Sequence, residues 1–183
     1  EGFGVGLKGK TLGVIGLGKL GAQAARVGLA FGMNVIAWSQ NLTEERCAEV
    51  GVTLAGKEEL FSEADVITIH MVLSDRSRDL VSATELSLMK SSAYLVNTSR
   101  GPIVNEAALL DTLQNRRIAG AGLDVFDIEP LPKDHPLRGL DNTVLTGHTG
   151  YVILELYDKV YNQAVEDIIG WINKSPVRLL NGE

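Results

Sequence analysis

The sequence has 183 residues, of which 45% are hydrophobic and 22% are charged, a composition typical of a folded domain. Its net charge of −6 disfavours a protein that binds the nucleic-acid backbone, because such a protein needs a basic face. A single cysteine excludes a disulfide framework, and no Cys or His spacing suggests a metal site. No apolar run reaches the roughly 18 residues of a membrane span. We therefore expect a cytoplasmic protein with no metal, membrane or nucleic-acid partner.

Short β-branched apolar runs alternate along the chain with helical patterns, as in a parallel sheet whose strands are joined by crossover helices. The expected strands are residues 12–15, 34–38, 66–69, 93–97, 119–123 and 143–146, with a weaker strand at 52–54. This alternation predicts an α/β fold with a Rossmann-type, doubly wound parallel sheet.

The helix expected after the first strand has two apolar faces. One face carries larger residues at steps of three and four, Leu20, Ala24, Val27 and Phe31. The other carries small residues that would let the helix lie close to the sheet, Gly21, Ala25 and Gly28.

Further helices are expected at residues 57–64 and after three suitable N-cap residues, Thr43, Thr84 and Asn105. A long amphipathic helix follows Gly150 and ends near Asn173, so that it covers residues 150–173. We interpret residues 1–183 as one domain, with residues 1–9 as a linker from a domain outside this chain.

A glycine-rich loop follows the first strand directly, with Gly16, Gly18 and Gly21 in a G-x-G-x-x-G pattern that opens a helix. In this pattern the first glycine permits a tight turn, the second lets a pyrophosphate approach the backbone, and the third lets helix and strand pack closely. Free backbone N–H groups and the helix dipole then bind the phosphates. The loop predicts a dinucleotide site, and a purely structural glycine turn is the alternative.

The end of the second strand bears on the choice of dinucleotide. The fingerprint has an acidic residue there, which binds the 2′-OH of the adenosine ribose. This sequence instead has Ser39, Gln40 and Asn41, with no carboxylate. Ser39 would not repel a 2′-phosphate, although no arginine follows directly and Arg46 lies one or two helical turns away. We predict weak discrimination between NAD and NADP with a preference for NADP; alternatively, Ser39 is only a turn residue.

Three polar side chains follow different strands of the expected sheet. Arg100, Glu129 and His148 come after strands 93–97, 119–123 and 143–146, and ligands of open α/β sheets bind outside these strand ends. A guanidinium can bind a carboxylate in a bidentate manner, and an imidazole titrates near neutrality. The set could therefore bind an anionic substrate and transfer a proton. Taken singly, each residue could instead be a surface ion-pair partner or a turn residue.

Two other histidines are less informative. His70 ends the strand at 66–69, beside the expected cofactor groove, where its ring could serve packing or chemistry. His135 lies in a polar stretch and is expected to be a solvated loop residue.

At these motifs the sequence resembles the NAD(P)-binding domain of the D-isomer-specific 2-hydroxyacid dehydrogenase family, from about Gly6 to the final helix. The matching motifs, in order, are residues 9–12, the glycine loop, residues 64–70, 95–101, 121–126 and 129–132, and His148 near Gly150. The resemblance implies a domain that binds NAD or NADP. It further implies an oxidoreductase that reduces a small 2-oxo acid to the D-2-hydroxy acid by hydride transfer, and a homodimer.

The resemblance also assigns roles to residues. Arg100 would bind the substrate carboxylate and polarise its carbonyl, His148 would be the acid/base, and Glu129 would orient His148. The cofactor contacts that it implies are Gly16, Gly18, Lys19, Leu20, Gly21, Ser39, His70, Val72, Thr98, Asp124 and Gly150.

The sequence departs from the family pattern without losing a catalytic group. Ser39 stands where the family usually has an acidic residue, and Gly147 stands where it usually has a proline. Thr149 stands in place of the usual aliphatic residue, and Val72 stands where proline is common. The family's second domain, built mostly from an N-terminal stretch, is absent from these 183 residues. We therefore expect this chain to bind cofactor but to have little or no turnover by itself.

Two other functions remain open on the sequence alone. The same family includes corepressor-like members, in which cofactor binding regulates binding of a protein partner. A different Rossmann enzyme, such as a relative of adenosylhomocysteine hydrolase, is disfavoured by the set of Arg100, Glu129 and His148.

Overall fold

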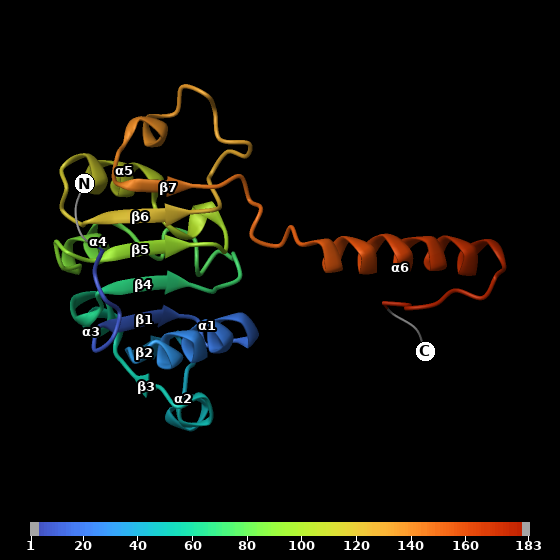
Figure 1. Ribbon diagram of the computed structural model, residues 1–183, viewed down its shortest axis with the longest axis horizontal. Coiled ribbons are helices and arrows are strands. Elements are labelled where there is room, and N and C mark those ends of the chain that lie inside the picture. Colours follow the sequence, from blue (N-terminus) through green and yellow to red (C-terminus); the bar gives the residue numbers. More distant parts are fainter. Residues whose placement is uncertain (1–3, 181–183) are drawn as a thin grey trace. The chain divides into compact units, whose positions relative to one another are not determined.

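The computed structural model describes residues 4–180, whose strands form one parallel sheet in the order β3-β2-β1-β4-β5-β6-β7. The strands are β1 (Thr11–Ile15), β2 (Asn34–Trp38), β3 (Thr53–Leu54), β4 (Val66–Ile69), β5 (Tyr94–Asn97), β6 (Gly120–Leu123) and β7 (Thr143–Leu145). All seven predicted strands are present, with end points within about one residue of the prediction. Their carboxyl ends lie along one edge of the sheet (Figure 1). The predicted Rossmann-type fold is confirmed.

The helices are α1 (Lys19–Ala30), α2 (Glu44–Val50), α3 (Lys57–Glu63), α4 (Ala83–Leu88), α5 (Glu106–Gln114) and α6 (Leu154–Ile172), with short 3₁₀ helices η1 (Gly101–Ile103) and η2 (Pro136–Gly139). Two predicted N-caps are confirmed. The Thr43 hydroxyl accepts the Arg46 N–H at 3.2 Å, and the Asn105 side chain accepts the Ala108 N–H at 3.0 Å.

The N-cap predicted at Thr84 is wrong, because α4 begins two residues earlier. Ser82 is the cap, and its hydroxyl accepts the Thr84 N–H at 3.2 Å. The carboxylate of Glu85 accepts the Ser82 N–H at 2.8 Å and also bonds the Lys57 ammonium at 2.7 Å. Both hydroxyl residues suit a cap, but only Ser82 has a glutamate three residues later to complete a capping box.

The Glu85 carboxylate makes the stability of the sheet domain depend on pH in the acid range. Burial raises the pKa of Glu85, but hydrogen bonds from Lys57 and Ser82 outweigh it and lower the pKa from 4.5 to about 2. The carboxylate therefore stabilises the fold above about pH 4.5, and this contribution, on the order of 3 kcal/mol, is lost as the pH falls towards 2. The free energies of unfolding of wild type and Glu85→Gln should converge over that range. A gap that stays constant with pH would contradict this pairing.

The side chains of β1 alternate between two hydrophobic cores. Leu12 and Val14 belong to a core shared with α1 and α2. Ile15 belongs to a larger core that includes Leu60 and Phe61 of α3 and residues of β4, β5 and β6. Because both faces of a parallel sheet are covered, its strands are apolar along their length, which explains why they were predictable.

Helix α1 packs on the sheet through its small-residue face. Gly21, Ala25 and Gly28 are buried, and a Cβ on Gly28 would lie 2.6 Å from the Leu12 side chain. The larger residues on its other face, Leu20, Val27 and Phe31, are exposed. The close helix–sheet approach that the small residues predicted is confirmed.

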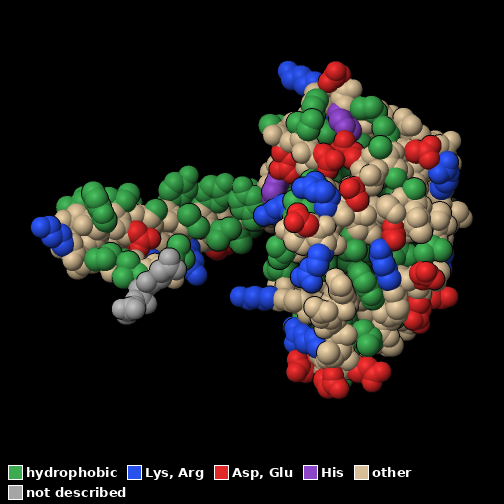
Figure 2. Space-filling view, turned by 180° about the vertical axis from the view of Figure 1, so that it is seen from behind, with side chains coloured by type: hydrophobic (Ala, Val, Ile, Leu, Met, Phe, Trp, Pro, Cys, Tyr) green, Lys and Arg blue, Asp and Glu red, His purple; other side chains and the backbone are tan. Residues whose placement is uncertain are grey.

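Of the residues that the structure describes, 4–148 form one compact unit and 149–180 form another. Its helix α6 begins at Leu154, has Asn173 as its C-cap, and exposes apolar side chains along its length (Figure 2). Within this unit Arg178 bonds back onto α6, to Asp167 at 3.0 Å and Glu166 at 2.8 Å. None of the helices found in residues 4–180 is long and apolar enough to cross a membrane.

Candidate active site

The glycines of the loop between β1 and α1 differ in why they must be glycine. Gly16 has φ +91°, and a Cβ on Gly21 would lie 1.9 Å from the Gly16 carbonyl oxygen. The fold itself therefore requires these two. A Cβ on Gly18 would meet no heavy atom within 4 Å, so that packing within the described residues does not explain this glycine. A pyrophosphate that approached the backbone closely would require a glycine here.

The N-terminus of α1 is open to an anion. Gly18 is its N-cap, no side chain caps it, and its first turn has no acidic residue. The unpaired N–H groups and the helix dipole at such an end favour a phosphate. Arg46 stabilises the preceding turn, since its guanidinium donates to the Leu17 carbonyl at 3.3 and 3.4 Å and pairs with Glu49 at 2.7 Å.

A cleft of about 580 Å³ lies beside this helix end, at the carboxyl edge of the sheet. It is lined by residues of three loops, which are Gly18, Lys19 and Leu20, then residues 70–73 after β4, and then residues 98–100 after β5. Two apolar side chains of this lining are exposed to solvent, Leu20 by 68% and Val72 by 85%. Side chains of this kind could cover the face of a flat ring in the cleft. The cleft unites six predicted cofactor residues with Arg100.

His70 is half-buried at the back of this cleft, with its Nε2 3.0 Å from the Thr68 hydroxyl. Burial lowers the pKa of His70, so that its ring is neutral at neutral pH. His70 therefore lines the cleft as a neutral, half-buried ring, and its contact with a cofactor stays a prediction.

Asn97 builds the turn that presents Thr98 and Arg100, a role that the sequence did not reveal. It is 1% exposed, its Nδ2 donates to the Arg100 carbonyl at 2.9 Å, and its Oδ1 accepts the Ser99 N–H at 3.0 Å. The Ser99 hydroxyl donates to the Ile69 carbonyl at 2.7 Å and ties the turn to β4. A polar residue ending an otherwise apolar strand was the available signal.

Gly101 brings the Arg100 turn against the loop that carries Glu129. A Cβ on Gly101 would lie 2.1 Å from the carbonyl carbon of Phe126, which is closer than any side chain permits. In the same loop, the Phe126 N–H donates to Glu129 Oε1 at 3.0 Å. Gly101 is thus a positioning residue for Arg100 and Glu129.

His148 and Glu129 form a direct pair, with His148 Nδ1 2.7 Å from Glu129 Oε2. Burial raises the pKa of Glu129, but hydrogen bonds from His148 and Phe126 and the charges of His148 and Arg100 lower it below its ordinary value overall. Glu129 is therefore a carboxylate near neutral pH, which makes Nδ1 the donor and fixes the tautomer of the ring. The backbone of His148 has φ +57°, in the left-handed region, so that the chain leaves the extended conformation of a strand at this residue.

The remaining predicted residues lie in three different places. Asp124 is 7% exposed and accepts a hydrogen bond from the Thr146 hydroxyl at 2.5 Å. Ser39 lines a separate cavity. Gly150 belongs to the second unit, which begins at Thr149.

His135 is not the solvated loop residue that we expected. Its Nε2 bonds Glu106 at 3.1 Å, its Nδ1 accepts the Leu137 N–H at 3.3 Å, and its side chain is only 17% exposed. The ring caps the N-terminus of η2. The polar residues beside His135 in the sequence gave no indication of this role. Within residues 4–180, no group of three or more His, Cys, Asp or Glu side chains could hold a metal ion.

Comparison with known proteins places the chain in a family. Residues 1–150 match the model of the D-isomer specific 2-hydroxyacid dehydrogenase, NAD binding domain. The chain is 41% identical over 182 residues to a glyoxylate reductase of Aeropyrum pernix, covering 99% of this chain and 54% of that protein. It thus spans about half the length of curated relatives that it matches.

Among the solved structures that are similar to this chain, two were determined with different bound ligands. An acyclic imino acid reductase (Bsp5) in complex with NADPH and D-Arg has a TM-score of 0.79 and 31% identity, covering 97% of this chain and 55% of that one. A D-lactate dehydrogenase from Aquifex aeolicus complexed with NAD and lactic acid has a TM-score of 0.78 and 30% identity, covering 91% and 54%.

The chain belongs to the D-isomer specific 2-hydroxyacid dehydrogenase family, and residues 1–150 are its NAD binding domain. The resemblance stated from the sequence motifs is confirmed.

Proposed function

We propose that this chain is the dinucleotide-binding half of an NAD(P)-dependent oxidoreductase that reduces a small 2-oxo acid to the D-2-hydroxy acid. The observation that carries the proposal is the pair of His148 and Glu129, 2.7 Å apart, within electrostatic reach of Arg100. A guanidinium for the substrate carboxylate and a carboxylate-held imidazole are the groups that carbonyl reduction needs besides a hydride donor.

The cleft fits a dinucleotide on the evidence of Gly18, whose missing Cβ leaves room that nothing in the described residues fills. A bound reduced nicotinamide would supply the hydride to C2 of the substrate. The uncapped end of α1 would hold the pyrophosphate, and Leu20 and Val72 would shield the ring from water.

The residues of the chain then have separate tasks in the reaction. Arg100 binds the substrate carboxylate and draws electron density towards the carbonyl oxygen. As C2 gains hydride, the carbonyl oxygen takes a proton from Nε2 of His148. Glu129 holds Nδ1 and stabilises the imidazolium before that transfer. In the reverse direction His148 accepts the proton from the hydroxyl group.

The substrate class, the cofactor preference and the oligomeric state each have support of their own. Glyoxylate reductase activity of a relative favours a small 2-oxo acid as substrate. Ser39, in place of an acid at the end of β2, supports a preference for NADP. The homodimer implied by the family resemblance stays a prediction, which sedimentation of the purified chain tests.

Arg100→Ala in the complete enzyme tests the assignment of the substrate site. Loss of a bidentate, charge-assisted contact should lower kcat/KM by about tenfold to a hundredfold. The Kd for the dinucleotide, measured by calorimetry, should stay within about twofold, because the proposed cofactor contacts do not include Arg100.

A control variant for this experiment is Arg138→Ala, whose guanidinium donates to carbonyls of residues 131 and 132 outside the cleft. If Arg100→Ala weakens the binding of substrate and the binding of cofactor equally, Arg100 has a structural role and the proposed substrate site is wrong.

A further inference from the structure

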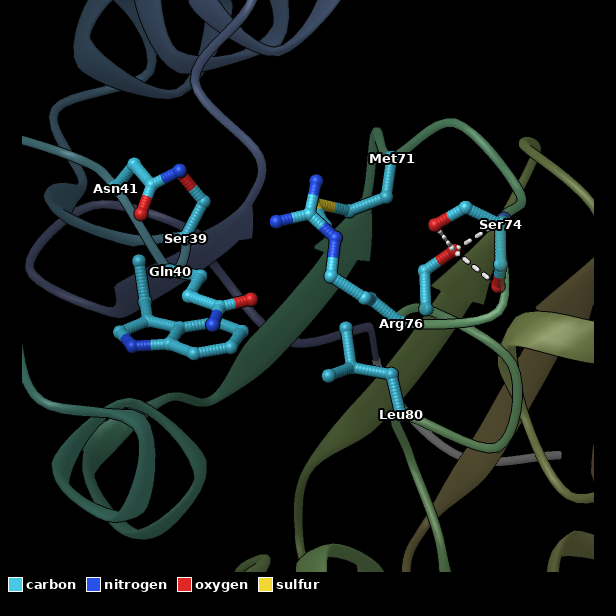
Figure 3. Close-up of a pocket in the computed structure, with 9 residues that line it drawn as sticks. Ser39, Gln40, Asn41, Met71, Ser74, Arg76 and Leu80 are labelled. Carbon is cyan, nitrogen blue, oxygen red and sulfur yellow. Dashed lines mark hydrogen bonds between the residues drawn. The ribbon is translucent and has the colours of Figure 1, made fainter.

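A second cavity, of about 190 Å³, lies at the carboxyl end of β2. Its walls are residues 38–41, which follow β2, and part of the loop between β4 and α4. The two walls face each other in Figure 3, with Ser39, Gln40 and Asn41 on one side and Met71, Arg76 and Leu80 on the other.

The cavity is lined by one cation and no acidic residue. Arg76 is the only charged side chain among its lining residues. Figure 3 shows this side chain extending from its loop towards the side of Ser39 and Gln40. Neither the Arg76 guanidinium nor the Ser39 hydroxyl has a hydrogen-bond or ion-pair partner within residues 4–180. An arginine and a hydroxyl that line one cavity, with no carboxylate among the other lining residues, can bind an anion.

The loop that carries Arg76 is internally fixed. Ser77 is 1% exposed, and its hydroxyl donates to the Val72 carbonyl at 2.7 Å while it accepts the Ser74 N–H at 2.7 Å. These bonds hold the backbone on both sides of Arg76. The arginine is therefore presented on a preformed turn, which lowers the ordering cost of binding.

We propose that Arg76 determines cofactor choice, and that Arg76 and Ser39 together bind the ribose 2′-phosphate of NADPH. This inference rests on the proposed dinucleotide site, since the end of β2 is where the adenosine ribose lies in the Rossmann arrangement. The sequence did not indicate Arg76, because it comes after β4 rather than after β2. Arg46, the arginine nearer in sequence, is already bound to the Leu17 carbonyl and to Glu49.

The alternative role for Arg76 is stacking on the adenine ring, which NADH and NADPH share. Stacking would strengthen the binding of NADH and NADPH equally, whereas a contact with the 2′-phosphate would strengthen the binding of NADPH alone. The ratio of the two Kd values therefore separates these roles.

The test is calorimetric titration of the 183-residue chain with NADH and with NADPH, in wild type, Arg76→Ala and Arg78→Ala. Arg78 lies on the same loop but outside the cavity, so its variant controls for the loss of one positive charge. Wild type should bind NADPH more tightly than NADH. Arg76→Ala should raise the Kd for NADPH by about tenfold to a hundredfold and leave that for NADH within about twofold. Arg78→Ala should change neither by more than about twofold.

A second variant tests the opposite wall of the cavity. Ser39→Asp should reverse the preference, because a carboxylate repels a phosphate and accepts a hydrogen bond from the ribose 2′-OH. Equal weakening of both cofactors in Arg76→Ala, or no change in either, would overturn the role of Arg76 while leaving the dinucleotide site intact. Failure of wild type to bind either cofactor would overturn the proposed function and this inference with it.

Discussion

Replacing His148 by alanine in the complete enzyme should lower kcat by about 10²–10⁴-fold. The variant removes the group that exchanges a proton with the substrate oxygen, while Arg100 and the cofactor cleft remain in place. Steady-state and single-turnover rates of 2-oxo-acid reduction measure this effect. The Kd for the dinucleotide should stay within about twofold of wild type.

The chain offers a matched control, because it contains a second histidine–glutamate pair. His135 Nε2 lies 3.1 Å from Glu106 Oε1, and neither residue lines the cleft. His135→Ala should therefore leave kcat within about twofold of wild type. A fall of less than tenfold for His148→Ala would show that His148 is not the acid. An equal fall for both variants would indicate a loss of structure rather than of chemistry.

The second large effect concerns two glycines of one loop that should respond to alanine in opposite ways. Gly18→Ala should leave the free energy of unfolding nearly unchanged, because its Cβ meets nothing within 4 Å, yet raise the dinucleotide Kd by about tenfold or more. Gly21→Ala should destabilise the domain by about 4 kcal/mol or more, because its Cβ would lie 1.9 Å from a carbonyl oxygen.

Denaturant unfolding and calorimetric titration of both variants separate these outcomes. If Gly18→Ala binds NADH and NADPH as wild type does, no pyrophosphate approaches the loop closely. The glycine pattern would then be the structural turn that we considered from the sequence.

The strands were predictable because both faces of the sheet are buried, so that β1 and its neighbours are apolar over their whole length. The helix caps were less certain, since Ser82 and Thr84 both carry a hydroxyl that can cap a helix and only the contact of Glu85 with Ser82 decides between them. Local patterns therefore fixed the elements well and their starting residues less well.

Part of the candidate site depends on contacts between distant segments, which local patterns do not contain. Gly101 must be glycine because Phe126 passes within 2.1 Å of the position of a Cβ. Arg76 faces the end of β2 only because the loop after β4 folds around Ser77. Arg100, Glu129 and His148 could be found from the sequence, since each follows a recognisable strand at the shared sheet edge.

The most direct measurement is a titration of the chain with NADH and NADPH while the fluorescence of Trp38 is followed. Trp38 lines the cavity at the end of β2, and Trp171→Phe makes it the only tryptophan of the chain. We expect saturable quenching of Trp38 fluorescence by at least one dinucleotide, and weaker dinucleotide binding in Gly18→Ala. No binding of either dinucleotide to a folded chain would contradict the central claim.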